Sequence, residues 1–276
     1  MNAVVDAGTP GRPARRGRWR RIALVLIAAY VTSALWQAHK PLPAGLSAAL
    51  PLRPATAVVV LADLTWSDAD GRRHGDQAIF DELLRLVGQA QRLVVVDQFL
   101  FNDFAGDADA GHRRLSSELT DALVQRKAAV PGLRMVVITD PINTVYGGTA
   151  AHHLERLERA GAQVVVTDLA RLRASNPAWS GLWHLCCVWA GNSADGGWLP
   201  SPFGTGKVTL RSWLALLNFR ANHRKTLIVD QGDDWVGLVG SGNPHDASSR
   251  HGNIAVRFAG AAALDLLATE QAVAAF

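Results

Sequence analysis

The chain has 276 residues, of which 49% are hydrophobic and 19% are charged. This composition is typical of a globular protein with a sizeable core and excludes a wholly disordered chain. Residues 1–40 carry six arginines and Lys40 against a single acid, Asp6, whereas the whole chain has a net charge of +4, so residues 41–276 have a net charge of −2. The sequence pI of about 9.5 is therefore a property of the N-terminal segment. The rest of the chain has no excess of positive charge that could attract a polyanion, so nucleic acid is not an expected partner.

The only two cysteines, Cys186 and Cys187, are adjacent. Neighbouring cysteines rarely pair with each other, because disulfide geometry strains the peptide between them. They also lack the spacing of a metal site or a disulfide framework. We therefore predict two buried, unpaired cysteines that behave as small apolar residues.

The N-terminal segment divides into three parts. Residues 1–21 are rich in proline, glycine and arginine and predict a disordered basic tail. Residues 22–38 predict a transmembrane or signal-anchor helix, although the uncharged run Ile22–Trp36 gives only about 22 Å of helix for a hydrocarbon core of roughly 30 Å. Residues 39–54 contain four prolines and predict a linker.

Arginines before this helix and few positive charges after it place the N-terminus in the cytoplasm. We expect a bacterial inner-membrane protein whose catalytic body lies in the periplasm. A cleaved signal peptide followed by export is the alternative, and a buried helix of a soluble domain is a third interpretation.

Residues 55–276 alternate between apolar runs typical of strands and amphipathic segments typical of helices, which predicts an α/β fold with a mixed or parallel sheet. Residues 168–220 interrupt this pattern as a tryptophan-rich insertion. Its five tryptophans line an acyl-chain groove, lie at a bilayer interface, or pack as the insertion's own core. The expected strands are 57–62, 92–101, 133–139, 163–167, 225–229, 235–239 and 251–258, and the expected helices are 76–91, 115–129, 150–160, 208–219 and 260–276.

One stretch combines the polar residues that phosphate chemistry requires. His223, Lys225 and Asp230 have the spacing H-x-K-x4-D, and Gly240-Ser241-x-Asn243 follows a second apolar run. In a strand, alternate side chains share a face, so residues 223 and 225 are expected to point the same way. An imidazole, an ammonium, a hydroxyl and an amide at neighbouring strand ends are suited to binding and attacking a phosphate.

This pattern resembles the signature of the phospholipase D superfamily, which includes phospholipases, cardiolipin synthases, related phosphatidyltransferases and some nucleases. The resemblance covers residues 55–276 and is strongest over 218–260. It implies one phospholipase D-like half-domain with a mixed sheet flanked by helices on both faces. It also implies a histidine nucleophile that forms a phosphohistidine, a second histidine that protonates the leaving alcohol, and no cofactor or metal.

The resemblance assigns roles to individual residues. His223 is one of the two histidines, and Lys225 and Asn243 hold the phosphoryl oxygens. Ser241 hydrogen-bonds near the imidazole or the phosphate. Asn253 occupies the place of a histidine-orienting residue.

Three acids near the motif have less direct roles. Asp230 completes the catalytic motif, more as a structural polar residue than as a proton carrier. Asp97 and the turn Asp140-Pro141-x-Asn143 follow expected strands of the same sheet and either line the pocket or cap the turns.

The sequence contains one H-x-K-x4-D motif, whereas the family site needs two. Three interpretations follow. A second copy of the chain supplies the other motif, or the chain is the N-terminal half of a longer protein whose C-terminal half carries it, or the chain is inactive alone. We expect a membrane-anchored phosphodiesterase or phosphatidyltransferase that acts on phospholipids. A homodimeric, metal-independent nuclease and a non-catalytic half-site that binds phosphate head groups are the alternatives.

Overall fold

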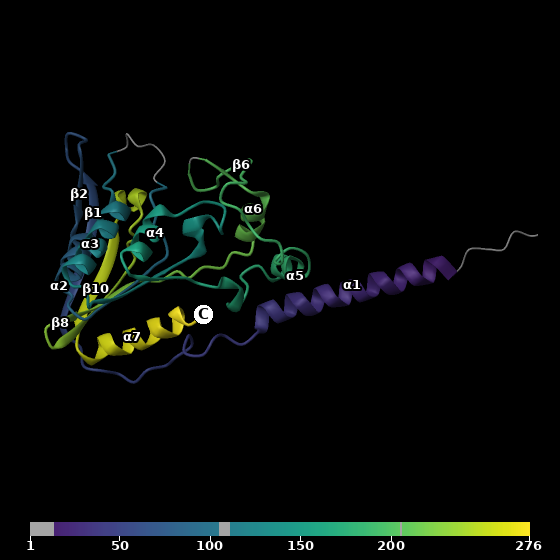
Figure 1. Ribbon diagram of the computed structural model, residues 1–276, viewed down its shortest axis with the longest axis horizontal. Coiled ribbons are helices and arrows are strands. Elements are labelled where there is room, and N and C mark those ends of the chain that lie inside the picture. The colour runs from purple at the N-terminus through teal and green to yellow at the C-terminus, as the bar shows by residue number, and fades with distance from the viewer. Residues whose placement is uncertain (1–13, 105–110, 205) are drawn as a thin grey trace, which may run out of the picture.

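The computed structural model describes residues 14–104, 111–204 and 206–276, and within them one eight-stranded sheet organises the fold (Figure 1). The strand order is β2-β1-β10-β9-β8-β3-β4-β5. The three strands β3, β4 and β5 are parallel to one another, and all other neighbours are antiparallel. The predicted mixed sheet is confirmed. The strand bounds are β1 Thr56–Ser67, β2 Arg73–Gln77, β3 Leu93–Gln98, β4 Arg134–Thr139, β5 Gln163–Val166, β8 Lys225–Gln231, β9 Asp234–Gly240 and β10 Asn253–Ala259.

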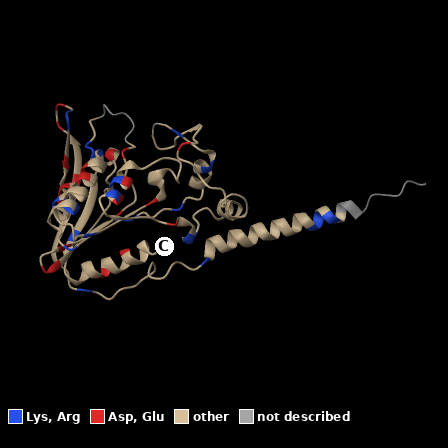
Figure 2. Cartoon of the chain, viewed as in Figure 1, with Lys and Arg blue, Asp and Glu red and all other residues tan. Residues whose placement is uncertain are grey.

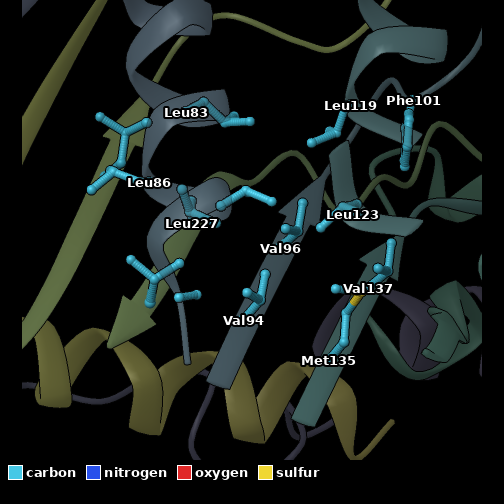
Figure 3. Close-up of a cluster of buried hydrophobic side chains, with 14 of the residues drawn as sticks. Leu83, Leu86, Val94, Val96, Phe101, Leu119, Leu123, Met135, Val137 and Leu227 are labelled. Atoms are coloured by element: carbon cyan, nitrogen blue, oxygen red, sulfur yellow. The ribbon is translucent and has the colours of Figure 1, made fainter. Parts of the chain in front are cut away.

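Helices cover both faces of this sheet, as predicted. Helices α2 (Ala78–Gln89), α3 (Leu115–Ala129) and α4 (His152–Arg159) pack on one face, and α7 (Ala261–Ala274) packs on the other. The larger core lies beneath the three helices, where Leu86, Leu119 and Leu123 meet the inner strands (Figure 3). Short 3-10 helices span Pro141–Thr144, Leu169–Arg171 and Asp246–Arg250.

The centre of the sheet is the best-buried part of the molecule. Strands β3, β4 and β8 carry unbroken apolar runs because helices cover them on both sides. Val96, Val137 and Ile228 are fully buried there. Side chains at the ends of these strands are therefore held by a rigid scaffold.

Strand β1 differs from its prediction. It continues to Ser67, pairs with an unpredicted strand β2, and is mostly exposed rather than buried. The reason is that α7 packs against β8, β9 and the adjoining part of β10 and leaves one face of β1 uncovered. Across this uncovered face, Val60 pairs with Val256, which in turn pairs with Val239. We call the exposed side chains on this side the bare sheet face: Val60, Leu64, Trp66, Val239, Ile254 and Val256.

The N-terminal helix α1 runs from Ala14 to His39 and projects away from the sheet (Figure 1). It begins earlier than expected, so residues 14–21, predicted to be disordered, are helical. The rest of the predicted tail, residues 1–13, lies outside the described residues. Basic residues gather at the far end of α1 (Figure 2), and its middle exposes an apolar surface. Gly17–His39, with a mean hydropathy of 1.5, is long and apolar enough to be a membrane anchor or a signal sequence.

The other end of α1 packs against the insertion. Its partner is helix α5 (Pro177–Cys186), and Ser33 Oγ donates to the carbonyl oxygen of Gly181 at 3.0 Å. A Cβ at Gly181 would lie 2.8 Å from the backbone nitrogen of Ala34, so only glycine permits this approach. Close packing through small residues is also how helices pair within membranes.

The insertion contains α5, a short hairpin and helix α6 (Leu210–Leu216), which is shorter than the predicted helix 208–219. The hairpin strands are β6, Leu199–Pro200, and β7, Lys207–Val208. Its tryptophans do not form a common core. Trp183 is buried, whereas Trp189 and Trp198 are 79% and 63% exposed.

The cysteine prediction was wrong. Cys186 and Cys187 form a disulfide with each other, and Cys186 is exposed. Helix α5 ends at Cys186, and Cys187 leaves the helical conformation with φ −130°. This change of backbone direction allows the two sulfurs to meet, although their Cα atoms are only 3.7 Å apart.

Candidate functional site

His223 and Lys225 lie together at the start of β8. His223 precedes the strand and is exposed, whereas Lys225 is its first residue and is buried. The Lys225 Nζ lies 3.3 Å from Nδ1 and 3.2 Å from Nε2 of His223. Phe99 forms a wall beside both, with its ring centroid 4.5 Å from that of His223 and 4.9 Å from the Lys225 Nζ. The predicted pairing of an imidazole with an ammonium is present in the geometry.

Burial sets the charges of this pair. The Lys225 pKa is lowered to about 8 by desolvation, and Asp97 partly opposes the shift. Desolvation and the charge of Lys225 both lower the pKa of His223. The imidazole is therefore neutral at pH 7, with a nitrogen lone pair beside a cation.

Asn222 fixes the backbone that carries His223. Its backbone N–H donates to Asp140 Oδ2 at 2.7 Å, and its side-chain Nδ2 donates to Asp97 Oδ1 at 2.8 Å. Asp97 belongs to β3 and Asp140 follows β4, so two adjacent parallel strands hold this residue. Asp140 also accepts from the Ile142 N–H and thereby has the turn-capping role that the sequence suggested.

A buried charge network lies behind the histidine. Arg224 donates to Glu270 Oε1 at 2.7 Å, and its Nε lies 3.7 Å from Asp97 Oδ2. Glu270 is fully buried and also accepts from Thr226 Oγ1 at 2.8 Å. Burial and the neighbouring Glu270 raise the Asp97 pKa to about 9, so Asp97 carries a proton at neutral pH. Arg224 therefore balances the Glu270 carboxylate that it contacts.

The two polar residues in the second half of the motif, Asn243 and Ser241, make separate contacts. Asn243 is half-buried, and its Oδ1 accepts from the Leu100 N–H at 3.2 Å, next to Phe99 in the wall of the site. Ser241 instead donates to Asn253 Oδ1 at 3.1 Å and accepts from the Ile254 N–H at 3.0 Å. Asn253 thus holds Ser241 in this chain, and its role in orienting a histidine stays a prediction. Asn222 holds the backbone next to His223.

Asp230 is at the opposite end of β8 from His223. Its carboxylate is 1% exposed and accepts from the backbone N–H groups of Gln91, Arg92 and Leu93. These contacts fix the start of β3 against β8. They support the structural role predicted for Asp230 and exclude direct contact with a phosphate at His223.

Sequence reasoning missed Phe99 and Glu270 as parts of the site, whereas Asn143 belongs to a turn that the sequence singled out. Asn143 holds the turn after β3, because its Oδ1 accepts from Phe101 N–H at 2.9 Å and its Nδ2 donates to Phe99 O at 2.9 Å. Glu270 shares the buried face of α7 with Ala263 and Val273. An acid in that helical register was the signal that could have identified it.

No group of three metal-ligating side chains lies close enough together to hold a metal ion in the described part of the chain.

No family model matches the sequence, and no curated protein matches it. Among solved structures, the chain is similar to Nuc from Salmonella typhimurium, a phospholipase D family member, with 14% identity, a TM-score of 0.41 and coverage of 78% of this chain and 91% of that one. NucT from Helicobacter pylori has 11% identity and a TM-score of 0.37 over 78% of this chain and 93% of that one. Polyphosphate kinase from Porphyromonas gingivalis has 12% identity and a TM-score of 0.32 over 72% of this chain and 23% of that one. At these identities the likeness concerns the fold alone.

The Asp230→Asn variant is expected to lose stability but keep the site. An amide presents an N–H₂ group to the N–H groups of residues 91–93, which leaves buried donors unpaired and lowers the unfolding free energy by about 2 kcal/mol. Because backbone donors lower the Asp230 pKa in the folded state, the stabilisation is present above the unfolded pKa and is lost as pH falls through the folded pKa.

Denaturant unfolding at pH 7 and at acidic pH measures this difference, with the exposed Asp233→Asn on the same hairpin as the matched control. An Asp230→Asn protein with full stability but no activity would show that Asp230 takes part in the chemistry.

Proposed function

We propose that the chain is a membrane-anchored enzyme of the phospholipase D type, which acts on phospholipid phosphodiesters by hydrolysis or phosphatidyl transfer. The neutral His223 imidazole beside the buried Lys225 ammonium is the observation that carries this proposal. A phosphodiester is resistant to attack because its anionic oxygens repel nucleophiles. A neutral nitrogen nucleophile with a cation 3.2 Å away overcomes that repulsion.

In the first step, a ring nitrogen of His223 attacks phosphorus, an N–P bond forms, and the bond to the leaving alcohol breaks. A second histidine donates a proton to that alcohol. Lys225 and the Asn243 amide stabilise the negative charge that grows on the phosphoryl oxygens. In the second step, water or another alcohol gives its proton to the second histidine and attacks phosphorus, which releases His223.

A second copy of this chain supplies the second histidine in this proposal. The bare sheet face borders the ends of β9 and β10, where Ser241 and Asn253 meet. On this face Val60 is 63% exposed and Ile254 is 58% exposed. An apolar surface of this kind beside an incomplete site favours a self-complementary contact.

The α1 helix anchors the protein in the proposal. Its end is folded into the body, where Gln37 and Lys40 are buried and Gln37 Oε1 accepts from Arg220 Nη2 at 2.7 Å. Cleavage between α1 and the body would discard these contacts, which favours an uncleaved anchor. The arginines at the other end of α1 favour a cytoplasmic N-terminus and a periplasmic body.

The His223→Ala variant is expected to lose at least 10³-fold in activity on phosphatidylcholine or phosphatidylglycerol vesicles and to form no phosphohistidine after an acid quench. The exposed His152→Ala is the matched control and should keep full activity. Full activity in His223→Ala would refute the assignment. Comparable metal-free cleavage of plasmid DNA in EDTA would favour a nuclease, and vesicle binding without phosphohistidine would favour a non-catalytic head-group binder.

The pH dependence of kcat/KM is expected to fall as pH rises through about 8, because Lys225 then loses the charge that stabilises the transition state. In Lys225→Arg the side chain stays charged, so the rate is lower but this alkaline fall shifts upward by more than one pH unit. The exposed Lys207→Arg should keep the wild-type profile. An unchanged alkaline fall in Lys225→Arg would assign it to another group.

The Val60→Asp variant is expected to abolish self-association, because a carboxylate on the bare sheet face cannot be desolvated without a partner. Sedimentation in detergent should show a monomer with less than a tenth of the wild-type activity. Val166→Asp, which is also on an exposed strand position but at the β5 edge, should stay associated and active. A wild-type monomer with full activity would contradict the need for a second copy.

A further inference from the structure

A cavity of about 230 Å³ lies between the insertion and the sheet, apart from the His223 pocket. Pro141 and Thr167, which follow strands β4 and β5, form its floor. Tyr146 and insertion residues form the rest of the wall, and Lys40, the residue after α1, contacts that wall through its Nζ, which donates to the Ala170 carbonyl. The polar and aromatic side chains that line it include Tyr146, Asp168, Trp183, His184, Arg211 and Arg220.

The principal charge in this wall is the Arg220 guanidinium, which is only 6% exposed. Its Nη1 donates to the Leu169 carbonyl at 3.3 Å and its Nη2 to Gln37 Oε1 at 2.7 Å, and both acceptors are neutral. Its Nε is buried without a hydrogen-bond partner among the described residues. A buried cation whose protein partners are neutral lacks the compensation that such burial normally requires.

Neighbouring cations add to this positive charge. Arg211 also lines the cavity, lies 5.1 Å over the Trp183 ring and donates to the carbonyl oxygens of Val188 and Ala190. In the described part of the chain neither Arg211 nor Arg220 has a carboxylate partner within ion-pair distance. The positive charge of the wall therefore exceeds the negative charge of its one acid, Asp168. This acid is exposed and accepts from the Ala170 N–H.

The pKa values reflect the same excess. Burial and the charge of Arg220 lower the Lys40 pKa to about 8, whereas Asp168 opposes that shift. Burial, Arg220 and Lys40 together lower the pKa of His184. His184 Nδ1 donates to the Ser180 carbonyl oxygen at 2.8 Å. When a bound anion favours protonation of the imidazole, Nε2 becomes a second N–H donor.

The backbone around the cavity is also unusual. Val145 and Tyr146 have φ values of +45° and +56°, and Phe219, next to Arg220, has +49°. Non-glycine residues rarely adopt this region, and a β-branched valine does so least readily. These conformations turn Tyr146 and Arg220 into the cavity wall, where both line it.

We propose that this cavity binds a phosphate group, either the phosphate of a lipid head group or a free phosphate. Two guanidinium groups, one buried and one stacked on an indole, provide the donors that phosphate oxygens prefer. The end of α1 contacts the wall, so an anchored protein holds the cavity at the level of the lipid head groups. This site does not depend on the chemistry at His223, and it would persist in a protein with no catalytic activity.

Phosphate binding is tested on the full chain in maltoside micelles, which contain no phosphate. His223→Ala with Lys225→Ala provides the background, because it removes the catalytic pocket as a competing anion site. Isothermal titration with inorganic phosphate should show one site per chain, and adding Arg211→Gln should weaken it at least tenfold. Arg134→Gln, which removes the same charge at the opposite end of β4, is the matched control and should leave the affinity unchanged.

The lipid source is tested by adding phosphatidylglycerol to the same micelles and counting retained lipid by native mass spectrometry. Lipid that is retained and displaces phosphate identifies a head-group site, whereas phosphate that binds and resists displacement identifies a soluble ligand. If the background protein neither binds phosphate nor retains lipid, the proposal is overturned. An equal loss in Arg211→Gln and Arg134→Gln would also overturn it.

If thermal unfolding shows that the background protein is not folded, the titration is repeated with His223 and Lys225 intact. Arg211→Gln should then lower the number of bound phosphates by one relative to Arg134→Gln. An equal number in both variants would again refute the site.

Discussion

The burial of the Lys225 ammonium at the start of β8 is the constraint on which the rest of the site depends. A cation in this position is costly unless its surroundings compensate it, and its lowered pKa of about 8 measures that cost. Asp97 opposes the pKa shift of Lys225 only in part, and its own pKa is raised by burial beside Glu270. The Lys225 Nζ has the His223 imidazole, the His223 carbonyl oxygen and the Phe99 ring as neighbours. A phosphate anion would supply the missing charge, so the protein without substrate is prepared to bind one.

The spacing of the motif has a mechanical explanation in β8. The strand has His223 and Lys225 at one end and Asp230 at the other, with Leu227, Ile228 and Val229 buried between them. Asp230 accepts three backbone N–H groups at the start of β3 and so fixes the register of β3 against β8. In that register Gln98 pairs with Lys225, which brings Phe99 to the histidine. The third motif residue therefore acts on the site through strand alignment rather than through contact.

Local patterns in the sequence were sufficient for much of this architecture. Helix α3 has the predicted bounds, Leu115–Ala129, because apolar residues recur at helical spacing and Pro131-Gly132 ends the pattern. Strand periodicity predicted that His223 and Lys225 share a face, and the two side chains lie together although His223 precedes the strand. These features depend on residues within a few positions of one another, which is the range over which a sequence pattern is informative.

Most features that sequence reasoning did not reveal involve contacts between segments that are distant in the chain. The apolar run at 57–62 is exposed, because whether a strand is covered depends on where α7 lies, about 200 residues later. The contact of Asn253 with Ser241 depends on the pairing of β9 with β10. The disulfide of Cys186 with Cys187 depends on where α5 ends, and no local signal marked that residue.

Helix α1 and the candidate site are joined by one short segment. Arg220 contacts Gln37 of α1, Asn222 is held by Asp97 and Asp140, and His223 follows directly. Two residues, Ala221 and Asn222, thus separate the contact with α1 from His223, and Arg220 and Asn222 are both buried. A displacement of α1 relative to the body would break the Gln37 contact and pull on the same backbone that orients the imidazole. The end of α1 is therefore part of the packing that positions His223.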